Sequence, residues 1–315
     1  MKNMKILFMG TSDFAVSSLE FIKNSEEEVI GIVTMPDRQK GRGMKLKASP
    51  VKEFAIRKDI AVFQPGNVKD QTFISKLREL KPDVVVVVAF GQILPKEILM
   101  IPRLGCINLH ASLLPRYRGA APINWAIING DKVTGVTTIY MDENLDTGGI
   151  LLQQEIEIED NDTAESLHNK LAKVGAHLLL ETLKRHKQKS ITPIFQDNSK
   201  ATPAPKLKKK DGLINWNKGS VEISNLIRGL NPKPGAFSYF DDKILKIFSG
   251  ISLKGDTKEI TPGTISEITK EGIRVSTGKG FLLIKEVQLQ NHNKMGIRDF
   301  LSGQRHRIHT GTILK

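Results

Sequence analysis

The sequence predicts an α/β fold in which a doubly wound parallel sheet is followed by a linker and a small antiparallel β-barrel. Three observations predict it. Continuously apolar runs alternate with helix-like stretches through the first half, as expected when helices cover both faces of a parallel sheet. A segment rich in Pro, Ser, Thr and Asn then interrupts this alternation. Beyond it, strand-like runs are separated by turn-forming residues, which is typical of a small barrel.

The elements of the first half follow from their side-chain patterns. Three apolar runs are predicted as strands that are buried on both faces, at residues 6–9, 29–33 and 84–88. Helices are expected at residues 14–23, 50–58, 70–80 and 163–187. Ser49 and Pro50 combine an N-cap residue with a proline in the first helical turn, and Asp162 or Thr163 is expected to cap the last of these helices.

The second half has a different texture. Strand-like runs at residues 237–251, 264–268, 273–277 and 281–289 surround one helical stretch at 221–230. Because 315 residues exceed the roughly 100–200 residues of one typical domain, two domains are expected. We place the first over residues 1–188, a linker over 189–206 and the barrel over 207–315.

The positive charge is concentrated in the second part of the chain. Residues 189–315 contain 22 Lys and Arg against 11 Asp and Glu, so they carry +11 of the total net charge of +13. Such an excess favours binding to a polyanion, most commonly a nucleic acid. A basic surface that only keeps the protein in solution is the open alternative.

Composition also excludes several classes of protein. The longest apolar run, residues 84–90, is far shorter than the ~18 residues that a membrane helix needs, and the N-terminus lacks a secretory cleavage site. The single cysteine, Cys106, allows neither an internal disulfide nor a cysteine metal cluster. We therefore expect a cytoplasmic protein with no membrane contact and no metal. The turn at residues 10–14 lacks the G-x-G-x-x-G pattern, which argues against a dehydrogenase.

The residues with catalytic potential cluster between residues 105 and 122. If the stretch 107–110 is extended, Asn108 and His110 point to the same face, and an amide beside an imidazole can stabilise an oxyanion. Asp146 is the best candidate to orient the imidazole. Taken singly, each residue also has a structural interpretation, as a turn former or as a hydrogen-bonded histidine.

Taken together, the motifs are far more specific. N-x-H at residues 108–110, S-L-L-P at 112–115 and D-T-G at 146–148 resemble, in this order, the signature of the folate-dependent formyltransferase family. The likeness extends over nearly the whole chain, for example at residues 117–123 and 262–265. The resemblance implies a Rossmann-like catalytic domain, a linker and an OB-like barrel that binds tRNA. Departures from the family pattern occur at Ser12, at Gln92 and in the linker.

The resemblance also implies a reaction: transfer of a formyl group from 10-formyltetrahydrofolate to the amino group of initiator methionyl-tRNA, for initiation of translation, by a protein expected to be a monomer. Asn108 and protonated His110 would stabilise the oxyanion, and Asp146 would hold His110 and help to remove the ammonium proton. Two alternatives stay open. The acceptor could be a small amine, glycinamide ribonucleotide or an amino sugar, or the chain could be a non-catalytic RNA-binding protein, against which the intact motifs argue.

The resemblance assigns two further groups of residues. The reduced folate would contact Phe90, Gly91, Ser112, Leu113, Leu114, Pro115 and Asp142. The tRNA would contact a basic loop that holds two glycines, together with lysines near the linker: Arg38, Lys40, Arg42, Lys45, Lys206, Lys208, Lys209 and Lys210.

Overall fold

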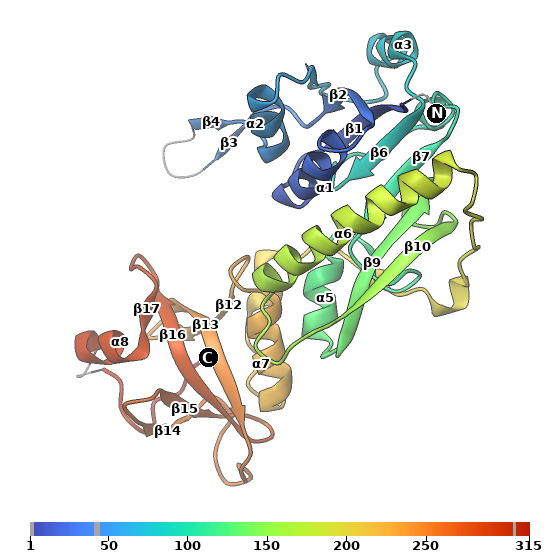
Figure 1. Cartoon of the computed structure of the whole chain (residues 1–315). Coiled ribbons are helices and arrows are strands. Elements are labelled where there is room, and N and C mark those ends of the chain that lie inside the picture. Colours follow the sequence, from blue (N-terminus) through green and yellow to red (C-terminus); the bar gives the residue numbers. More distant parts are fainter. Residues whose placement is uncertain (1–2, 41–44, 305–306) are drawn as a thin grey trace. The chain divides into compact units, whose positions relative to one another are not determined.

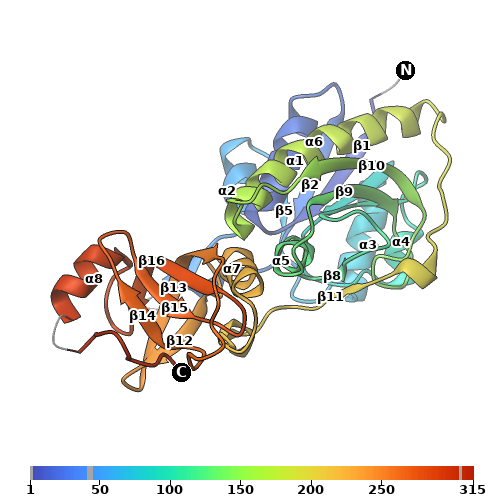
Figure 2. The same ribbon diagram turned by 90° about the horizontal axis from the view of Figure 1, so that it is seen from below.

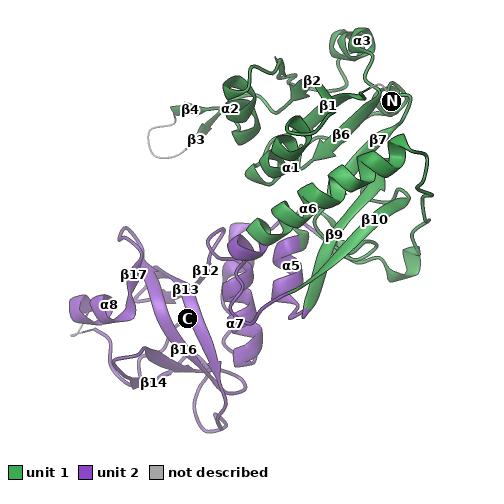
Figure 3. Cartoon of the chain, viewed as in Figure 1, with its two compact units in different colours: residues 1–122, 133–157, 168–204 green, residues 123–132, 158–167, 205–315 purple. Residues whose placement is uncertain are grey.

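Figure 1 shows the computed structural model of the chain, which describes residues 3–40, 45–304 and 307–315. The chain forms two compact units, coloured separately in Figure 3. Unit 1 comprises Met1–Pro122, Val133–Glu157 and His168–Ala204, and unit 2 comprises Ile123–Lys132, Ile158–Leu167 and Pro205–Lys315. The three sequence ranges expected above remain a prediction about domains, and each unit is described here by itself.

Unit 1 is built on a seven-stranded sheet with the order β10-β9-β7-β6-β1-β2-β5. The five strands from β7 to β5 are parallel, which confirms the expected parallel sheet. Strand β9 pairs antiparallel with both of its neighbours, β7 and β10, which the sequence did not predict. A loop of nine residues joins β9 to β10, and it is too short for the crossover that parallel strands require. The strands are β1 Lys5–Gly10, β2 Glu28–Val33, β5 Val62–Phe63, β6 Val84–Val88, β7 Cys106–His110, β9 Val133–Tyr140 and β10 Ile150–Glu157.

Helices cover both faces of this sheet. Figure 2 shows α1 and α6 on one side and α3 and α4 on the other. On the face covered by α3 and α4, Phe73, Ile74 and Leu77 of α3 pack with Leu7 and Val85 of the strands in one apolar cluster. The helices of unit 1 are α1 Asp13–Lys23, α2 Pro50–Arg57, α3 Gln71–Leu80, α4 Lys96–Leu99 and most of α6 Ala164–Lys187. Helix α5 Pro122–Ile128 belongs to unit 2 except for its first residue.

The capping predictions can be checked directly. The Ser49 hydroxyl accepts the backbone N–H of Lys52 at 3.0 Å, so Ser49 caps α2 as expected. The Thr163 hydroxyl accepts the N–H of Ser166 at 3.2 Å, which makes Thr163 the cap of α6. Asp162 instead accepts a hydrogen bond from the side chain of Ser166, at 2.7 Å.

Short elements complete unit 1. The strands β3 Arg38–Lys40 and β4 Lys45–Lys47 pair antiparallel, and β8 Arg118–Gly119 pairs in parallel with β11 Pro203–Ala204. The second pair joins chain segments about 85 residues apart. The 3-10 helix η1, Asn198–Lys200, precedes β11.

Unit 2 contains a six-stranded antiparallel sheet with the order β12-β13-β16-β15-β14, and β17 pairs with β16. Asp241 and Asp242 both have positive φ (46° and 59°), as a tight hairpin turn requires, and they divide the strand-like run expected at residues 237–251 into β12 and β13. The strands are β12 Ala236–Phe240, β13 Lys243–Leu253, β14 Ile265–Ile268, β15 Ile273–Ser276, β16 Phe281–Leu289 and β17 Met295–Gly296. The helices are η2 Lys209–Gly212, α7 Ser220–Gly229 and α8 Ile297–Gln304. No helix among the described residues combines the length and the apolar character needed to cross a membrane.

Cys106 gives a direct test of how tightly the sheet is packed. It is only 3% exposed, and burial raises the pKa of its thiol to about 12. Because only the thiolate reacts, we expect native Cys106 to react with an aromatic disulfide reagent at about pH 8 roughly a thousandfold more slowly than the same thiol in the denatured chain. The rate at which the reagent releases its aromatic thiolate, measured with and without guanidinium, gives this ratio. Equal rates would contradict the burial of Cys106.

Candidate active site

Strand β7 carries Asn108 and His110 to the carboxyl end of the parallel sheet, which is where ligands bind in open α/β folds. Asn108 lies in register with Val87 of β6, and His110 lies opposite Thr137 of β9. Ile107 and Leu109, which alternate with these two residues along the strand, are 0% and 3% exposed, as expected if they face the core. Asn108 and His110 therefore share one face of the strand.

The imidazole of His110 is buried and is held on both sides. Its Nε2 donates to the backbone carbonyl of Tyr117 at 2.9 Å, since a carbonyl oxygen can only accept. Its Nδ1 lies 3.6 Å from Oδ1 of Asp146, and the two side chains are only 7% and 11% exposed. The ring nitrogen that faces the carboxylate is thus Nδ1, at a distance longer than a tight hydrogen bond.

The loop that carries Asp146 is held by several contacts. The other carboxylate oxygen of Asp146, Oδ2, accepts the backbone N–H of Gly119 at 2.9 Å. Asp146 itself has φ +56°, a region that residues other than glycine seldom adopt. At the start of the loop, Asp142 accepts a hydrogen bond from the hydroxyl of Thr147 at 2.7 Å. The candidate folate residue Asp142 therefore also shapes the loop that places Asp146.

The S-L-L-P segment that follows β7 is fixed from within. The Ser112 hydroxyl donates to the carbonyl of Arg116 at 2.6 Å, and Ser112 is fully buried. The Thr137 hydroxyl donates to the carbonyl of Ser112 at 2.6 Å and accepts the N–H of Leu114 at 3.1 Å. Ser112 and Leu114 thus hold the shape of this loop, whereas Leu113 and Pro115 are half-buried and can contact a ligand.

A second loop follows the carboxyl end of β6. Phe90 is 3% exposed, and its carbonyl accepts the hydroxyl of Thr11 at 2.7 Å. Gly91 has φ +99°, which glycine adopts without strain. Gln92, one of the departures from the family pattern, accepts the N–H of Val68 at 3.1 Å and lies 3.2 Å from the sulfur of Met35. Its side chain therefore joins the loops that follow β2, β5 and β6.

The basic candidates fall into two groups. Arg38 and Lys45 lie in the β3–β4 hairpin, whereas Arg42 and the side chain of Lys40 lie outside the described residues. Near the base of the hairpin, Lys52 and then Gln64 hold the pKa of Asp37 below its usual range, through contacts of 2.8 Å each. The other group belongs to unit 2, at the start of that unit and in η2: Lys206, Lys208, Lys209 and Lys210.

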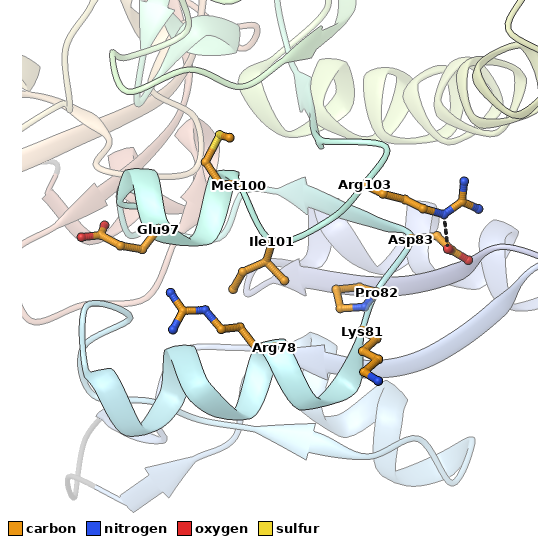
Figure 4. A pocket seen from close by; sticks show the side chains of 8 residues that line it. All are labelled: Arg78, Lys81, Pro82, Asp83, Glu97, Met100, Ile101 and Arg103. Carbon is orange, nitrogen blue, oxygen red and sulfur yellow. Dashed lines mark hydrogen bonds and ion pairs between the residues drawn. The ribbon is translucent and has the colours of Figure 1, made fainter.

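One hollow of about 530 Å³ lies elsewhere in unit 1 (Figure 4). Asp83, which directly precedes β6, places it at the amino end of the parallel strands, opposite the end where His110 lies. Asp83 accepts the Nε–H of Arg103 at 2.7 Å and the N–H of Lys5 at 2.8 Å, so its charge holds the sheet edge together. The hollow is lined by Arg78, Lys81, Pro82, Asp83, Glu97, Met100, Ile101 and Arg103 and offers no pairing of a nucleophile with a base.

The carboxyl end of β7 therefore offers the stronger chemistry. An amide, an imidazole and a carboxylate can stabilise an oxyanion and relay a proton. The described residues contain no group of three or more His, Cys, Asp or Glu side chains that could hold a metal ion. The sequence did not point to Tyr117 or Gly119, because both contact the site through the backbone, and a backbone group carries no signal in a residue pattern.

Comparison with known proteins identifies the family of the chain. The family model described as formyl transferase matches residues 4–183, and the model described as formyl transferase, C-terminal domain, matches residues 206–305. The chain is 49% identical to a methionyl-tRNA formyltransferase of Acetivibrio thermocellus over 99% of each chain. It is 50% identical to a protein of the same name from Caldanaerobacter subterraneus, over 99% of this chain and all of the other.

Solved structures share the fold at lower identity. The sugar 3N-formyl transferase WlaRD, with dTDP and 5-N-formyl-THF, matches with a TM-score of 0.68 at 24% identity, over 93% of this chain and all of the other. An N-formyltransferase of Helicobacter canadensis, in complex with folinic acid and dTDP-3-aminofucose, matches with a TM-score of 0.68 at 22% identity and the same coverage.

Proposed function

The chain belongs to the formyl transferase family, and from this premise we propose that it transfers the formyl group of 10-formyltetrahydrofolate to the amino group of initiator methionyl-tRNA, for initiation of translation. The observation that carries the proposal is identity of about half of all residues, over nearly the full length of both chains, with proteins named methionyl-tRNA formyltransferase. The family resemblance seen in the sequence is confirmed. Support for a reduced folate as donor comes from related folds that hold one.

The proposed catalytic residues are Asn108, His110 and Asp146. The amine attacks the formyl carbon, and the carbonyl oxygen becomes an oxyanion to which the Asn108 amide donates. In this proposal His110 is protonated on both nitrogens, so that Nε2 donates to the Tyr117 carbonyl and Nδ1 can donate to the oxyanion. Its separation of 3.6 Å from Asp146 leaves room to share that proton with a reactant.

The proton balance assigns the second task to Asp146. The attacking nitrogen must lose a proton, and the folate nitrogen must gain one when its bond to the formyl carbon breaks. The carboxylate of Asp146 accepts the first proton, directly or through water, and the same relay supplies the second. The folate itself would be contacted by Phe90, Gly91, Asp142 and the loop of residues 112–115.

The tRNA would be held by positive charge. The β3–β4 hairpin with its intervening residue Arg42 and the lysines at the start of unit 2 supply cations for the phosphate backbone. In this proposal, residues 1–188 are catalytic, 189–206 form the linker and 207–315 form the tRNA-binding domain. We further propose that the protein is cytoplasmic and monomeric.

The acceptor is the part of the proposal that one assay tests. Purified protein is given 10-formyltetrahydrofolate with initiator methionyl-tRNA, with glycinamide ribonucleotide or with an amino sugar nucleotide. We expect kcat/KM for formylation of the tRNA to be at least about a hundredfold above that for either small amine. A site shaped to hydrogen-bond one acceptor rejects an acceptor that leaves its buried polar groups unpaired. The small-amine function is disfavoured by the higher identity to the tRNA enzymes. Preferential formylation of a small amine would refute our proposal.

Salt gives an independent check of the charged surface. We expect the logarithm of the tRNA binding constant to fall linearly with the logarithm of salt concentration, with a slope of about −0.7 to −0.9 per phosphate neutralised. Filter binding at about 50–300 mM KCl measures the slope, and folate binding serves as the control with a much smaller dependence. Salt-independent tRNA binding would argue against the basic residues as its contacts.

A further inference from the structure

The segment of residues 194–204, which follows α6 in unit 1, contacts both partners of His110. Gln196 reaches the loop that carries Asp146, and Thr202 reaches the backbone of Tyr117. These contacts join stretches of chain about 50 and 85 residues apart. The segment therefore lies where it can set the position of the imidazole.

Gln196 uses both ends of its amide. Its Nε2 donates to the carbonyls of Asp146 and Gly148, each at 2.8 Å. Its Oε1 accepts from the guanidinium of Arg118, at 3.1 Å from Nε and 2.7 Å from Nη2. One side chain thus links the backbone of the Asp146 loop to the side chain of Arg118, the residue before Gly119, whose N–H the Asp146 carboxylate accepts.

Thr202 acts on the other side of the imidazole. Its hydroxyl accepts the N–H of Tyr117 at 2.9 Å, and its carbonyl accepts the N–H of Arg118 at 2.8 Å. Tyr117 has φ +61°, and its own carbonyl accepts the hydrogen bond from Nε2 of His110. The peptide unit that binds the imidazole is therefore held in an uncommon conformation by hydrogen bonds that it and the Tyr117 N–H donate to Thr202.

Apolar packing does not explain this segment. Ile194 and Phe195 are 66% and 94% exposed, so burial contributes little to their placement. The polar contacts of Gln196 and Thr202 place the middle of the segment on the site, while the backbone bridge between Ile194 and Ile150 and the β8–β11 pairing, where Ala204 is buried, hold its two ends. An element attached by polar contacts to catalytic loops contributes more to the geometry of those loops than to a core.

We propose that Gln196 and Thr202 are positioning residues for the formyl transfer, which act through Asp146 and Tyr117 on His110. This rests on the proposed function. A displacement of about 1 Å in a catalytic group can cost about a hundredfold in rate. Without the Gln196 amide, the Asp146 carbonyl loses a donor, and a backbone at φ +56° can relax toward a commoner conformation.

The test compares Gln196→Met, which keeps side-chain length but removes every hydrogen bond, with Asn198→Ala as the matched control. Asn198 accepts the same Arg118 Nη2, at 2.8 Å, so its variant loses a contact to Arg118 only. We expect Gln196→Met to lower kcat by about 10- to 100-fold with KM for both substrates within about threefold, and Asn198→Ala to stay within about twofold of wild type. A Gln196→Met enzyme with wild-type kcat would overturn the proposal.

A double-mutant cycle separates positioning from general stability. In an Asp146→Ala background we expect Gln196→Met to have an effect below about twofold, because its target has gone. An equal loss in both backgrounds would overturn the proposal. Where Gln196→Met unfolds, Gln196→Glu serves, because it keeps the Arg118 contact and removes both donations to the loop.

A readout without turnover completes the test. The ring resonances of His110, assigned with a His110→Gln variant, should shift in Gln196→Met and in Thr202→Val but not in Asn198→Ala. Unchanged resonances in the first two variants would overturn the proposal, whatever the rates show. A wild-type protein that does not formylate methionyl-tRNA would refute the proposed function instead, while the resonance shifts would still report the positioning contacts.

Discussion

Replacing His110 by alanine is expected to lower kcat for formyl transfer by about 10²–10³-fold, which is equivalent to about 2.7–4 kcal/mol of transition-state stabilisation. The reason is the geometry of the ring. Nε2 is held by the Tyr117 carbonyl and Nδ1 faces Asp146, so the imidazole is oriented before substrate arrives. Alanine removes both the donor and the proton relay. Single-turnover transfer to methionyl-tRNA measures the effect on the chemical step.

The control for this variant is His177→Ala. His177 is exposed on α6, where its Nδ1 lies 2.9 Å from the carbonyl of Lys173, so kcat should stay within about twofold of wild type. Thermal unfolding of both variants should remain a single transition. If His110→Ala turned over at the wild-type rate, the imidazole would have no part in the reaction and the catalytic assignment would fail.

The second large effect is expected at Gly148. A Cβ on Gly148 would overlap the carbonyl oxygen of Tyr140, a backbone atom at the end of β9 that cannot rotate away. The loop of residues 142–149 must therefore shift, and Asp146 shifts with it. A misplacement of about 1 Å costs about 10²-fold in rate, so Gly148→Ala should lower kcat by about that factor. The measurement is kcat at saturating folate and tRNA.

Gly66→Ala is the matched control, because a Cβ at Gly66 meets no atom within 4 Å. It should leave kcat unchanged and raise the free energy of unfolding slightly, if at all. The two variants therefore make the same substitution in unit 1, but only Gly148→Ala is expected to lower kcat. Normal kcat in Gly148→Ala would show that the Asp146 loop tolerates movement, contrary to the tight contacts described here.

Much of the fold was predictable because its signals are local. The valine run of β6 is hydrophobic on both faces and has no helical period, so it reads as a buried parallel strand, and Ser49-Pro50 marks a helix start by its own side chains. The antiparallel edge was not predictable in the same way. The directions of β9 and β10 depend on which neighbour each strand meets, and that is a property of the assembled sheet.

The same division applies to the candidate site. The family and the three residues proposed for chemistry could be inferred from the sequence alone, since Asn108, His110 and Asp146 occur in motifs whose order and spacing are specific. The tertiary structure alone decided which nitrogen of His110 faces the carboxylate and brought Gln196 and Thr202 to the loops around it. Hydrogen bonds to backbone carbonyls and amides depend on position and not on side-chain identity. Contacts of this kind, between segments 50 to 85 residues apart, exist only once the chain has folded.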